Sequence, residues 1–141
     1  MSENITLLIA AARDAAQNAY APYSGYHVGA ALRLSDGSII TGANFENASY
    51  GMTLCAETVA IANANSAGRL DQIRDIAIVG GPAGQVGIHK VTPCGRCRQI
   101  IKEVADITAH DIPVHCAHDG GCDTHLLSEL LPHAFGPANL K

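Results

Sequence analysis

The apolar residues alternate with polar ones in patterns that change along the chain. From Ile5 to Tyr20 they recur at three- and four-residue spacing, which predicts an amphipathic helix. Pro22 cannot continue a helix, so we expect this one to end before it. Two strand-like runs, His27–Leu34 and Ser38–Ala43, flank a turn signal at Ser35–Gly37 and predict a β-hairpin.

Helical and strand-like segments then alternate. The Ala-rich segment Thr53–Ala67 ends before a glycine and predicts a second helix. Ile73–Val79 is a short apolar run typical of a buried strand. A third helix, another strand and a final helical turn are predicted at Cys94–Ala105, Ile112–Cys116 and Leu126–Leu131. This order favours an α/β fold with one mixed sheet covered by helices on both faces.

Length and charge narrow the possibilities. A chain of 141 residues is long enough for one domain, residues 1–141, with a core that needs no disulfides. The net charge is −4 and no basic run occurs, so we expect no nucleic-acid partner and favour a small substrate. The polar start of the chain, and Arg13 and Asp14 within the first apolar stretch, argue against a signal peptide or membrane span. We therefore expect a cytoplasmic protein without membrane contact.

The cysteines point to a metal. Their number, five, is odd, and Cys94 and Cys97 form a CxxC pair, which favours metal ligation or free thiols over disulfides. Pro93 places this pair near a helix start, where thiolates are stabilised. Cys55 and Glu57 stand near the start of another predicted helix. Residues two apart in mid-helix point about 200° apart, so Cys55 must begin its helix if both are to reach one metal.

Three thiols and one carboxylate suit a catalytic zinc ion. Zn²⁺ with three protein ligands keeps an open position for water and makes hydroxide available as a nucleophile. Glu57 would carry protons from that water to a substrate ring nitrogen and to the departing ammonia. A structural zinc knuckle and a redox CxxC are the alternatives. The first needs a fourth ligand, which the sequence does not offer beside this pair, and the second leaves Cys55 and Glu57 unexplained.

Several stretches of the chain form an ordered set of motifs: Tyr20–Ser24, Val28–Leu32, Asn44–Tyr50, Cys55–Glu57, Pro93–Gln99 and Leu130–Pro137. In this order they resemble the motifs of the small homotetrameric zinc-dependent cytidine deaminases. The resemblance implies a three-layer α/β/α fold around a mixed five-stranded sheet and a homotetramer. It also implies hydrolytic deamination of cytidine and deoxycytidine to uridine and deoxyuridine with release of ammonia.

The resemblance also implies substrate-binding residues. Asn44 and Glu46 are similar to residues that hydrogen-bond the ribose 3′-hydroxyl, although an asparagine there could also simply fill a turn. Tyr26 stands where the family has a phenylalanine that packs on the nucleoside. The Ala56 N–H is similar to a group that meets the pyrimidine carbonyl, and the Thr92 carbonyl to one that accepts from the amino group.

Two aromatic residues resemble family contacts between subunits. Phe135 is similar to the residue that stacks on the pyrimidine bound by a neighbouring subunit, and core packing is the alternative for it. Tyr50 is similar to an interface tyrosine. If both roles hold, active sites are shared between subunits and the monomer is inactive.

One position departs from the family. Three thiolates leave zinc with a net negative charge, and many cysteine-only relatives place an arginine directly after the Cys-Ala-Glu motif. Here that residue is Thr58. We therefore predict that Arg96 donates a hydrogen bond to a zinc thiolate, with Cys55 as the first candidate. The alternative is a solvent-facing arginine.

His118, Cys122 and His125 have ligand-like spacing, but a turn at Asp119–Gly120 would spread them over two faces, so we predict no second zinc there. Two further functions stay open: a related aminohydrolase such as blasticidin S deaminase, and a catalytically silent, zinc-stabilised binding oligomer. Glu57 disfavours the silent oligomer.

Overall fold

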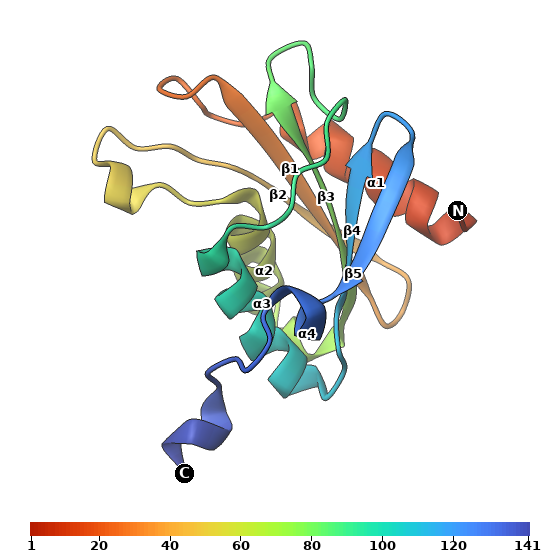
Figure 1. Ribbon diagram of the computed structural model, residues 1–141, viewed down its shortest axis with the longest axis vertical. Coiled ribbons are helices and arrows are strands. Elements are labelled where there is room, and N and C mark those ends of the chain that lie inside the picture. Colours follow the sequence, from red (N-terminus) through yellow and green to blue (C-terminus); the bar gives the residue numbers. More distant parts are fainter.

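The computed structural model describes all residues from 1 to 141 and contains one five-stranded sheet. The strands are β1 (Tyr26–Leu34), β2 (Ile39–Ala43), β3 (Ile73–Pro82), β4 (Pro113–His118) and β5 (Gly121–Leu126). They lie in the order β2, β1, β3, β4, β5 (Figure 1). Only β3 and β4 run parallel, so the sheet is mixed, as predicted.

Helices cover both faces of this sheet, which confirms the three-layer α/β/α fold (Figure 1). Helix α1 (Glu3–Ala16) lies on one face, and α2 (Ala56–Ser66) and α3 (Gly95–Thr108) lie on the other with the short α4 (Leu127–Leu130). Single turns of 3-10 helix occur at Tyr50–Met52, Leu70–Gln72 and Pro137–Leu140. None of the helices is long and apolar enough to cross a membrane.

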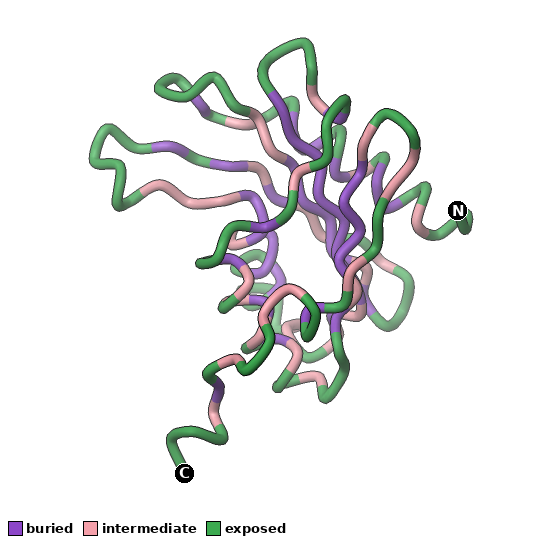
Figure 2. The backbone as a smooth tube through the Cα atoms, in the orientation of Figure 1, coloured by how far each residue is buried: buried purple, intermediate pink, exposed green.

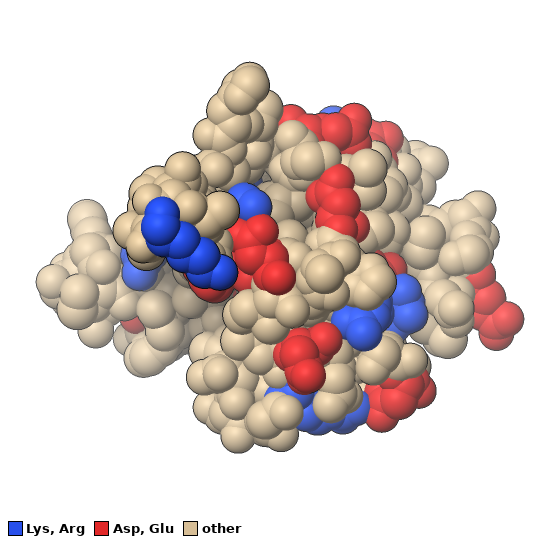
Figure 3. All heavy atoms as spheres, turned by 90° about the horizontal axis from the view of Figure 1, so that it is seen from below, with Lys and Arg blue, Asp and Glu red and all other residues tan.

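The core consists of two mainly aliphatic clusters, one on each face of the sheet. The buried residues are concentrated in the central strands of the sheet (Figure 2). Leu8 and Ala12 of α1 pack on Ala77 and Val79 of β3. The larger cluster lies under α2 and α3, and among its fully buried members are Leu32, Ile76, Ile78, Ile101 and Val114. On the surface seen in Figure 3, acidic and basic side chains are interspersed, and no continuous basic patch forms there.

The first helix is shorter than its pattern predicted, because the backbone of Tyr20 is used elsewhere. The Tyr20 N–H donates to the Asn44 carbonyl at 3.0 Å, and the Tyr20 carbonyl accepts from the Glu46 N–H at 2.9 Å. This long-range pairing overrides the local helical preference, so α1 ends at Ala16. The expected boundary at Tyr20 was wrong.

The second helix also begins later than predicted. Leu54 and Phe45 exchange both backbone hydrogen bonds at 2.9 Å, which holds residues 53 and 54 in an extended conformation. Cys55 is therefore the N-cap of α2, the position that the joint use of Cys55 and Glu57 required. Among the other elements, α3 and β4 run two or three residues further than expected, to Thr108 and His118.

Helix α2 packs directly on the sheet backbone at Gly42. A Cβ atom there would lie 2.4 Å from the Ala60 nitrogen and 2.7 Å from the Ala56 oxygen. Only glycine allows this approach, and it fixes the distance of the start of α2 from β2.

We expect Gly42→Ala to lower the free energy of unfolding by about 2–3 kcal/mol, because the helix backbone must move away from the sheet. Urea denaturation would measure this loss. Gly51→Ala is the matched control, since a Cβ at Gly51 meets no atom within 4 Å. Equal stability of the two variants would contradict the close packing of α2.

Candidate metal centre

The candidate site lies where two strands end at the same edge of the sheet. Both β2 and β3 are antiparallel to β1, so their carboxyl ends point the same way. The chain then leads from β2 into α2 and from β3 into α3. The N-termini of both helices are thus brought to one edge, which is where α/β proteins commonly bind ligands.

Three sulfurs meet at these helix N-termini. The Sγ atoms of Cys55, Cys94 and Cys97 all lie within 4.8 Å of one another, and those of Cys55 and Cys94 are 3.8 Å apart. Cys55 and Cys94 are the N-caps of α2 and α3, and Cys97 lies in the first turn of α3. Three soft donors at this spacing fit three positions of a tetrahedral zinc ion, as the spacing of the motifs predicted.

The surroundings of Cys55 favour its thiolate. Hydrogen bonds from the thiols of Cys97 and Cys94, together with the charge of Arg96, lower the pKa of Cys55 to about 6. Cys97, as the donor in this pair and a buried group, has a raised pKa. The positive ends of two helices add to the stabilisation of negative charge at the cluster.

Glu57 is buried beside the sulfurs. Only 4% of its surface is exposed, and it lines the same cavity as Cys55 and Cys94. Burial raises the pKa of Glu57 to about 7, because the charged carboxylate loses its hydration. A carboxyl group with this pKa can both accept and release protons near neutral pH, which suits general acid–base chemistry.

The cavity at the thiols is small and opens toward a second depression. The first has a volume of about 170 Å³ and the second of about 380 Å³. Thr53 lines both, so the two adjoin. The smaller cavity is lined by Val28, Asn44, Leu54, Cys55, Ala56, Glu57, Val91, Thr92 and Cys94, and the larger by Tyr23, Ser24, Glu46 and Tyr50.

Asn44 and Glu46 hydrogen-bond to backbone segments that form the walls of these two cavities. The Asn44 side chain accepts from the Val28 N–H and donates to the Tyr26 carbonyl, both at 2.9 Å. Glu46 accepts from the N–H groups of Tyr23 and Ser24 and from the Ser24 hydroxyl. An amide can make four hydrogen bonds and a carboxylate about four, so each side chain retains capacity for a ligand.

The other predicted contact residues lie around the thiol cavity. Ala56 is the first residue of α2, where its N–H has no intrahelical acceptor, and Thr92 forms part of the wall. The Tyr26 ring does not line either cavity. The ring instead packs against Gly80, where an added Cβ atom would lie 3.4 Å from a Tyr26 ring atom. The side chains of Val28 and Val91, which line the thiol cavity, also border this position.

Phe135 and Tyr50 are exposed, at 56% and 75%. Phe135 lines neither site cavity, and its ring is not in the core. Core packing, the alternative for Phe135, is therefore wrong. Tyr50 borders the larger depression, where its ring lies 5.9 Å from that of Tyr23.

The predicted hydrogen bond from Arg96 to a thiolate is wrong. Arg96 is exposed and donates to no sulfur, and its charge acts on Cys55 only through space. Thr58 instead makes the direct contact, with its hydroxyl 3.6 Å from the Cys97 Sγ. Thr58 is the third residue of α2, and its hydroxyl faces Cys97 in the first turn of α3, whereas Arg96 is exposed.

The residues considered for a second metal lie on two faces of the β4–β5 hairpin. Cys122, opposite Ala117, packs on the cluster under α1, whereas His125 stands opposite Val114 of the other cluster. His118 is 3.4 Å from an Asp123 carboxylate oxygen. Alternation along the strand separates them, as we argued from the turn.

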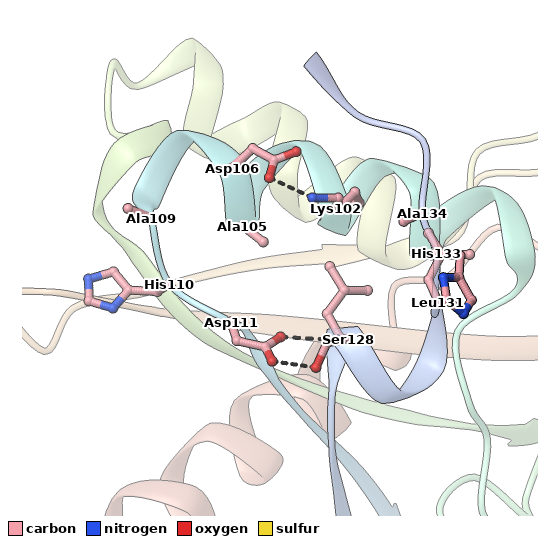
Figure 4. Close-up of a pocket in the computed structure, with 11 residues that line it drawn as sticks. Lys102, Ala105, Asp106, Ala109, His110, Asp111, Ser128, Leu131, His133 and Ala134 are labelled. Carbon is pink, nitrogen blue, oxygen red and sulfur yellow. Dashed lines mark hydrogen bonds and ion pairs between the residues drawn. The ribbon is translucent and has the colours of Figure 1, made fainter. Parts of the chain in front are cut away.

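The largest cavity, of about 470 Å³, lies elsewhere, between α3 and α4 (Figure 4). Its acidic groups are already engaged: Asp106 pairs with Lys102 at 2.6 Å, and Asp111 accepts from Ser128. The two histidines that border it, His110 and His133, stand at opposite ends. It therefore lacks the gathered ligands that the thiol cavity has.

Sequence reasoning missed two residues of the site. Thr53 joins the cavities only because the segment before α2 folds back on Phe45. Arg98, next to Cys97, donates to the carbonyls of Pro93 and Leu130, and its position within a recognised motif was the only available signal.

The chain is similar to known deaminases over nearly its whole length. Residues 2–110 match the family model described as the cytidine and deoxycytidylate deaminase zinc-binding region. A cytidine deaminase of Halalkalibacterium halodurans is 45% identical over 92% of each chain. A crystal structure of cytidine deaminase from Burkholderia pseudomallei shares 38% identity and a TM-score of 0.81, over 96% of this chain and 100% of that one. For the Mycobacterium tuberculosis enzyme the values are 37% and 0.75, over 96% and 99%.

Thr58→Val keeps the shape of the side chain and removes its hydroxyl. We expect the zinc affinity to fall about tenfold, because Cys97 loses a partner beyond the metal. Competition with a chelator would measure it. Arg96→Gln should change the affinity by less than about threefold, since solvent and salt screen an exposed charge.

Thr108→Val at the far end of α3 is the matched control for loss of a threonine hydroxyl. Unchanged zinc affinity in Thr58→Val, or a larger loss in Arg96→Gln, would show that the Thr58 hydroxyl does not support the thiolates.

Proposed function

The chain belongs to the cytidine deaminase family, and we propose that it catalyses the hydrolytic, zinc-dependent deamination of cytidine and deoxycytidine, releasing ammonia. The observation that carries the proposal is the buried Glu57 beside three convergent thiols in one small cavity. Zinc held by Cys55, Cys94 and Cys97 would supply a Lewis acid that activates water for attack on the ring carbon bearing the amino group.

The residues of the chain would hold the ring and move its protons. Glu57 takes a proton from the attacking water and passes it to the adjacent ring nitrogen. It then takes the second proton of that water from the new hydroxyl on the ring carbon and gives it to the departing amino group, so that the C–N bond breaks and ammonia leaves as the C=O bond forms. Its pKa of about 7 suits both directions of transfer. The Ala56 N–H, at the start of α2, can donate to the pyrimidine carbonyl. The Thr92 carbonyl can accept from the amino group.

The two adjoining cavities match the two halves of a nucleoside. The base fits the smaller cavity at the thiols, and the sugar extends past Thr53 toward the larger one. The remaining hydrogen-bonding capacity of Asn44 and Glu46 faces this path and would meet the ribose 3′-hydroxyl. Tyr26 supports the base from behind Val28 and Val91. A ligand without a sugar would leave this remaining capacity unused, which favours a nucleoside over a free base.

We further propose that the enzyme is a homotetramer with shared active sites. All four tyrosines and both phenylalanines are partly or largely exposed, which is unusual for large apolar side chains. Aromatic residues are enriched at subunit interfaces. Phe135 lies outside the cavities of its own chain, so it can stack only on a base bound by another subunit.

Other observations limit the alternatives. A catalytically silent binding oligomer would not need a dehydrated carboxyl group beside its metal. Burying a carboxyl group costs free energy, so the burial of Glu57 favours a catalytic role. The relatives named above are cytidine deaminases rather than blasticidin S deaminases. We place the enzyme in the cytoplasm as one catalytic domain, since all five cysteines are free and free thiols persist in a reducing compartment.

Glu57→Gln should retain its zinc and lose at least about a hundredfold in turnover, because the ligands are intact and the proton carrier is gone. The loss of cytidine absorbance and the zinc content would be measured on the same samples. Glu103→Gln, an exposed glutamate of α3, is the control. Near-normal turnover of Glu57→Gln would rule out the mechanism.

Phe135→Ala should raise the KM for cytidine about fivefold, because stacking contributes about 1 kcal/mol. Mixing it with Glu57→Gln protein under subunit exchange should restore sites of low KM, since one subunit supplies Glu57 and the other Phe135. Exchange confirmed by mass spectrometry without such recovery would contradict the shared site.

A further inference from the structure

Two half-buried cations, Arg74 and Arg98, pair with no carboxylate, and of these only Arg98 bonds to a segment distant in sequence. It follows Cys97 directly on α3, is half-buried and contacts no carboxylate. Four other cations, in contrast, are paired with aspartates: Arg33 with Asp75, Arg69 with Asp36, Lys90 with Asp123 and Lys102 with Asp106. A guanidinium withdrawn from water without a counter-charge is costly unless its hydrogen bonds are used.

The guanidinium of Arg98 donates its hydrogen bonds to uncharged oxygens in two segments that are far apart in the sequence. Its Nε donates to the Pro93 carbonyl at 2.7 Å, and its Nη1 donates to the Leu130 carbonyl at 2.8 Å. Its Nη2 lies 3.4 Å from the Thr92 hydroxyl. The planar fork of arginine can reach both sides at once, whereas the ammonium of lysine acts as a single point donor.

The first of these segments is a wall of the thiol cavity. Thr92 lines that cavity, and Pro93 precedes the ligand Cys94. Pro93 and Thr92 have no regular secondary structure. The hydrogen bond from Arg98 therefore fixes the direction of the Pro93 carbonyl and, with it, the path of the backbone at Thr92.

The second segment leads to Phe135. Leu130 is the last residue of α4, and its carbonyl belongs to the negative helix end that a cation stabilises. The adjacent Gln99 donates from its Nε2 to the Phe135 carbonyl at 2.9 Å. Arg98 and Gln99 thus attach the segment that carries Phe135 to α3 at two points.

We propose that Arg98 is a positioning residue that sets the Thr92–Pro93 wall of its own site and, through Leu130, the placement of Phe135. The part that concerns Phe135 rests on the proposed shared active site, whereas the Thr92–Pro93 part does not. The start of α3 also carries Cys94 and Cys97. One guanidinium therefore connects the metal-binding turn of a subunit to the segment whose aromatic ring, Phe135, would stack on the base bound by the neighbouring subunit.

The first test needs no catalysis. Hydrogen exchange followed by mass spectrometry should show residues 131–141 exchanging at least about tenfold faster in Arg98→Ala than in the wild-type chain, because the tie at Leu130 is lost. The zinc content should stay complete. Arg74→Ala is the matched control: Arg74 is also half-buried and donates to backbone carbonyls, but only to its neighbours Asp71 and Ile73.

The second test is kinetic. Arg98→Ala should raise the KM for cytidine about tenfold with less than about a threefold change in kcat, because substrate contacts are displaced while Glu57 and the thiols stay in place. Arg98→Lys should recover only a small part, and added methylguanidinium should lower the KM of Arg98→Ala. A merely structural arginine would change the melting temperature without this split between KM and kcat.

The outcomes separate the two proposals. If Phe135→Ala leaves KM unchanged, the shared site fails, and Arg98→Ala should still raise KM through Thr92 and Pro93. If the wild-type chain does not deaminate cytidine, the proposed function fails. The role of Arg98 is then judged from the hydrogen-exchange result alone. The inference would be overturned if hydrogen exchange of residues 131–141 in both Arg98→Ala and Arg98→Lys matched that of the wild-type chain. An unchanged KM in these variants would also overturn it.

Discussion

The site depends on the convergence of two helix N-termini at one edge of the sheet. Each brings a cysteine as its N-cap, Cys55 on α2 and Cys94 on α3, and the positive ends of both helices favour negative charge on the sulfurs. The convergence follows from topology, because β2 and β3 run in the same direction beside β1. It also requires the short distance between α2 and the sheet that Gly42 permits. A shift of either helix would separate the sulfurs.

Much of the fold could be predicted from the sequence because the local patterns and the packing agree. The hairpin, the buried strand β3 and the three long helices were all expected near their observed positions. The errors lie at helix ends where distant backbone groups compete. Tyr20 pairs with Asn44 and Glu46, and Leu54 pairs with Phe45. These partners are more than eight residues away in sequence, so no periodicity reveals them.

The chemical type of the site was easier to predict from the sequence than the directions in which its side chains point. The spacing of Cys55, Cys94 and Cys97 was sufficient to expect a cluster, since few arrangements use three thiols together. The prediction for Arg96 failed because the partner of the thiolates depends on which side chain faces the sulfurs. That direction follows from the mutual rotation of α2 and α3, which is set by packing and not by the motif. Charge alone favoured Arg96, and geometry favours the smaller hydroxyl.

The distribution of side chains links the core to the surface. The two core clusters contain no aromatic residue, so alanine, valine, leucine and isoleucine, with Cys116, fill the space between helices and sheet. Small side chains let the helices approach closely, and that approach keeps Glu57 dry. The aromatic residues are left at the surface, where a second copy of the chain can cover them. The proposed shared site requires the metal-binding helix and the exposed aromatic segment to be held together, and Arg98 donates hydrogen bonds to both sides of this connection, at Pro93 and at Leu130.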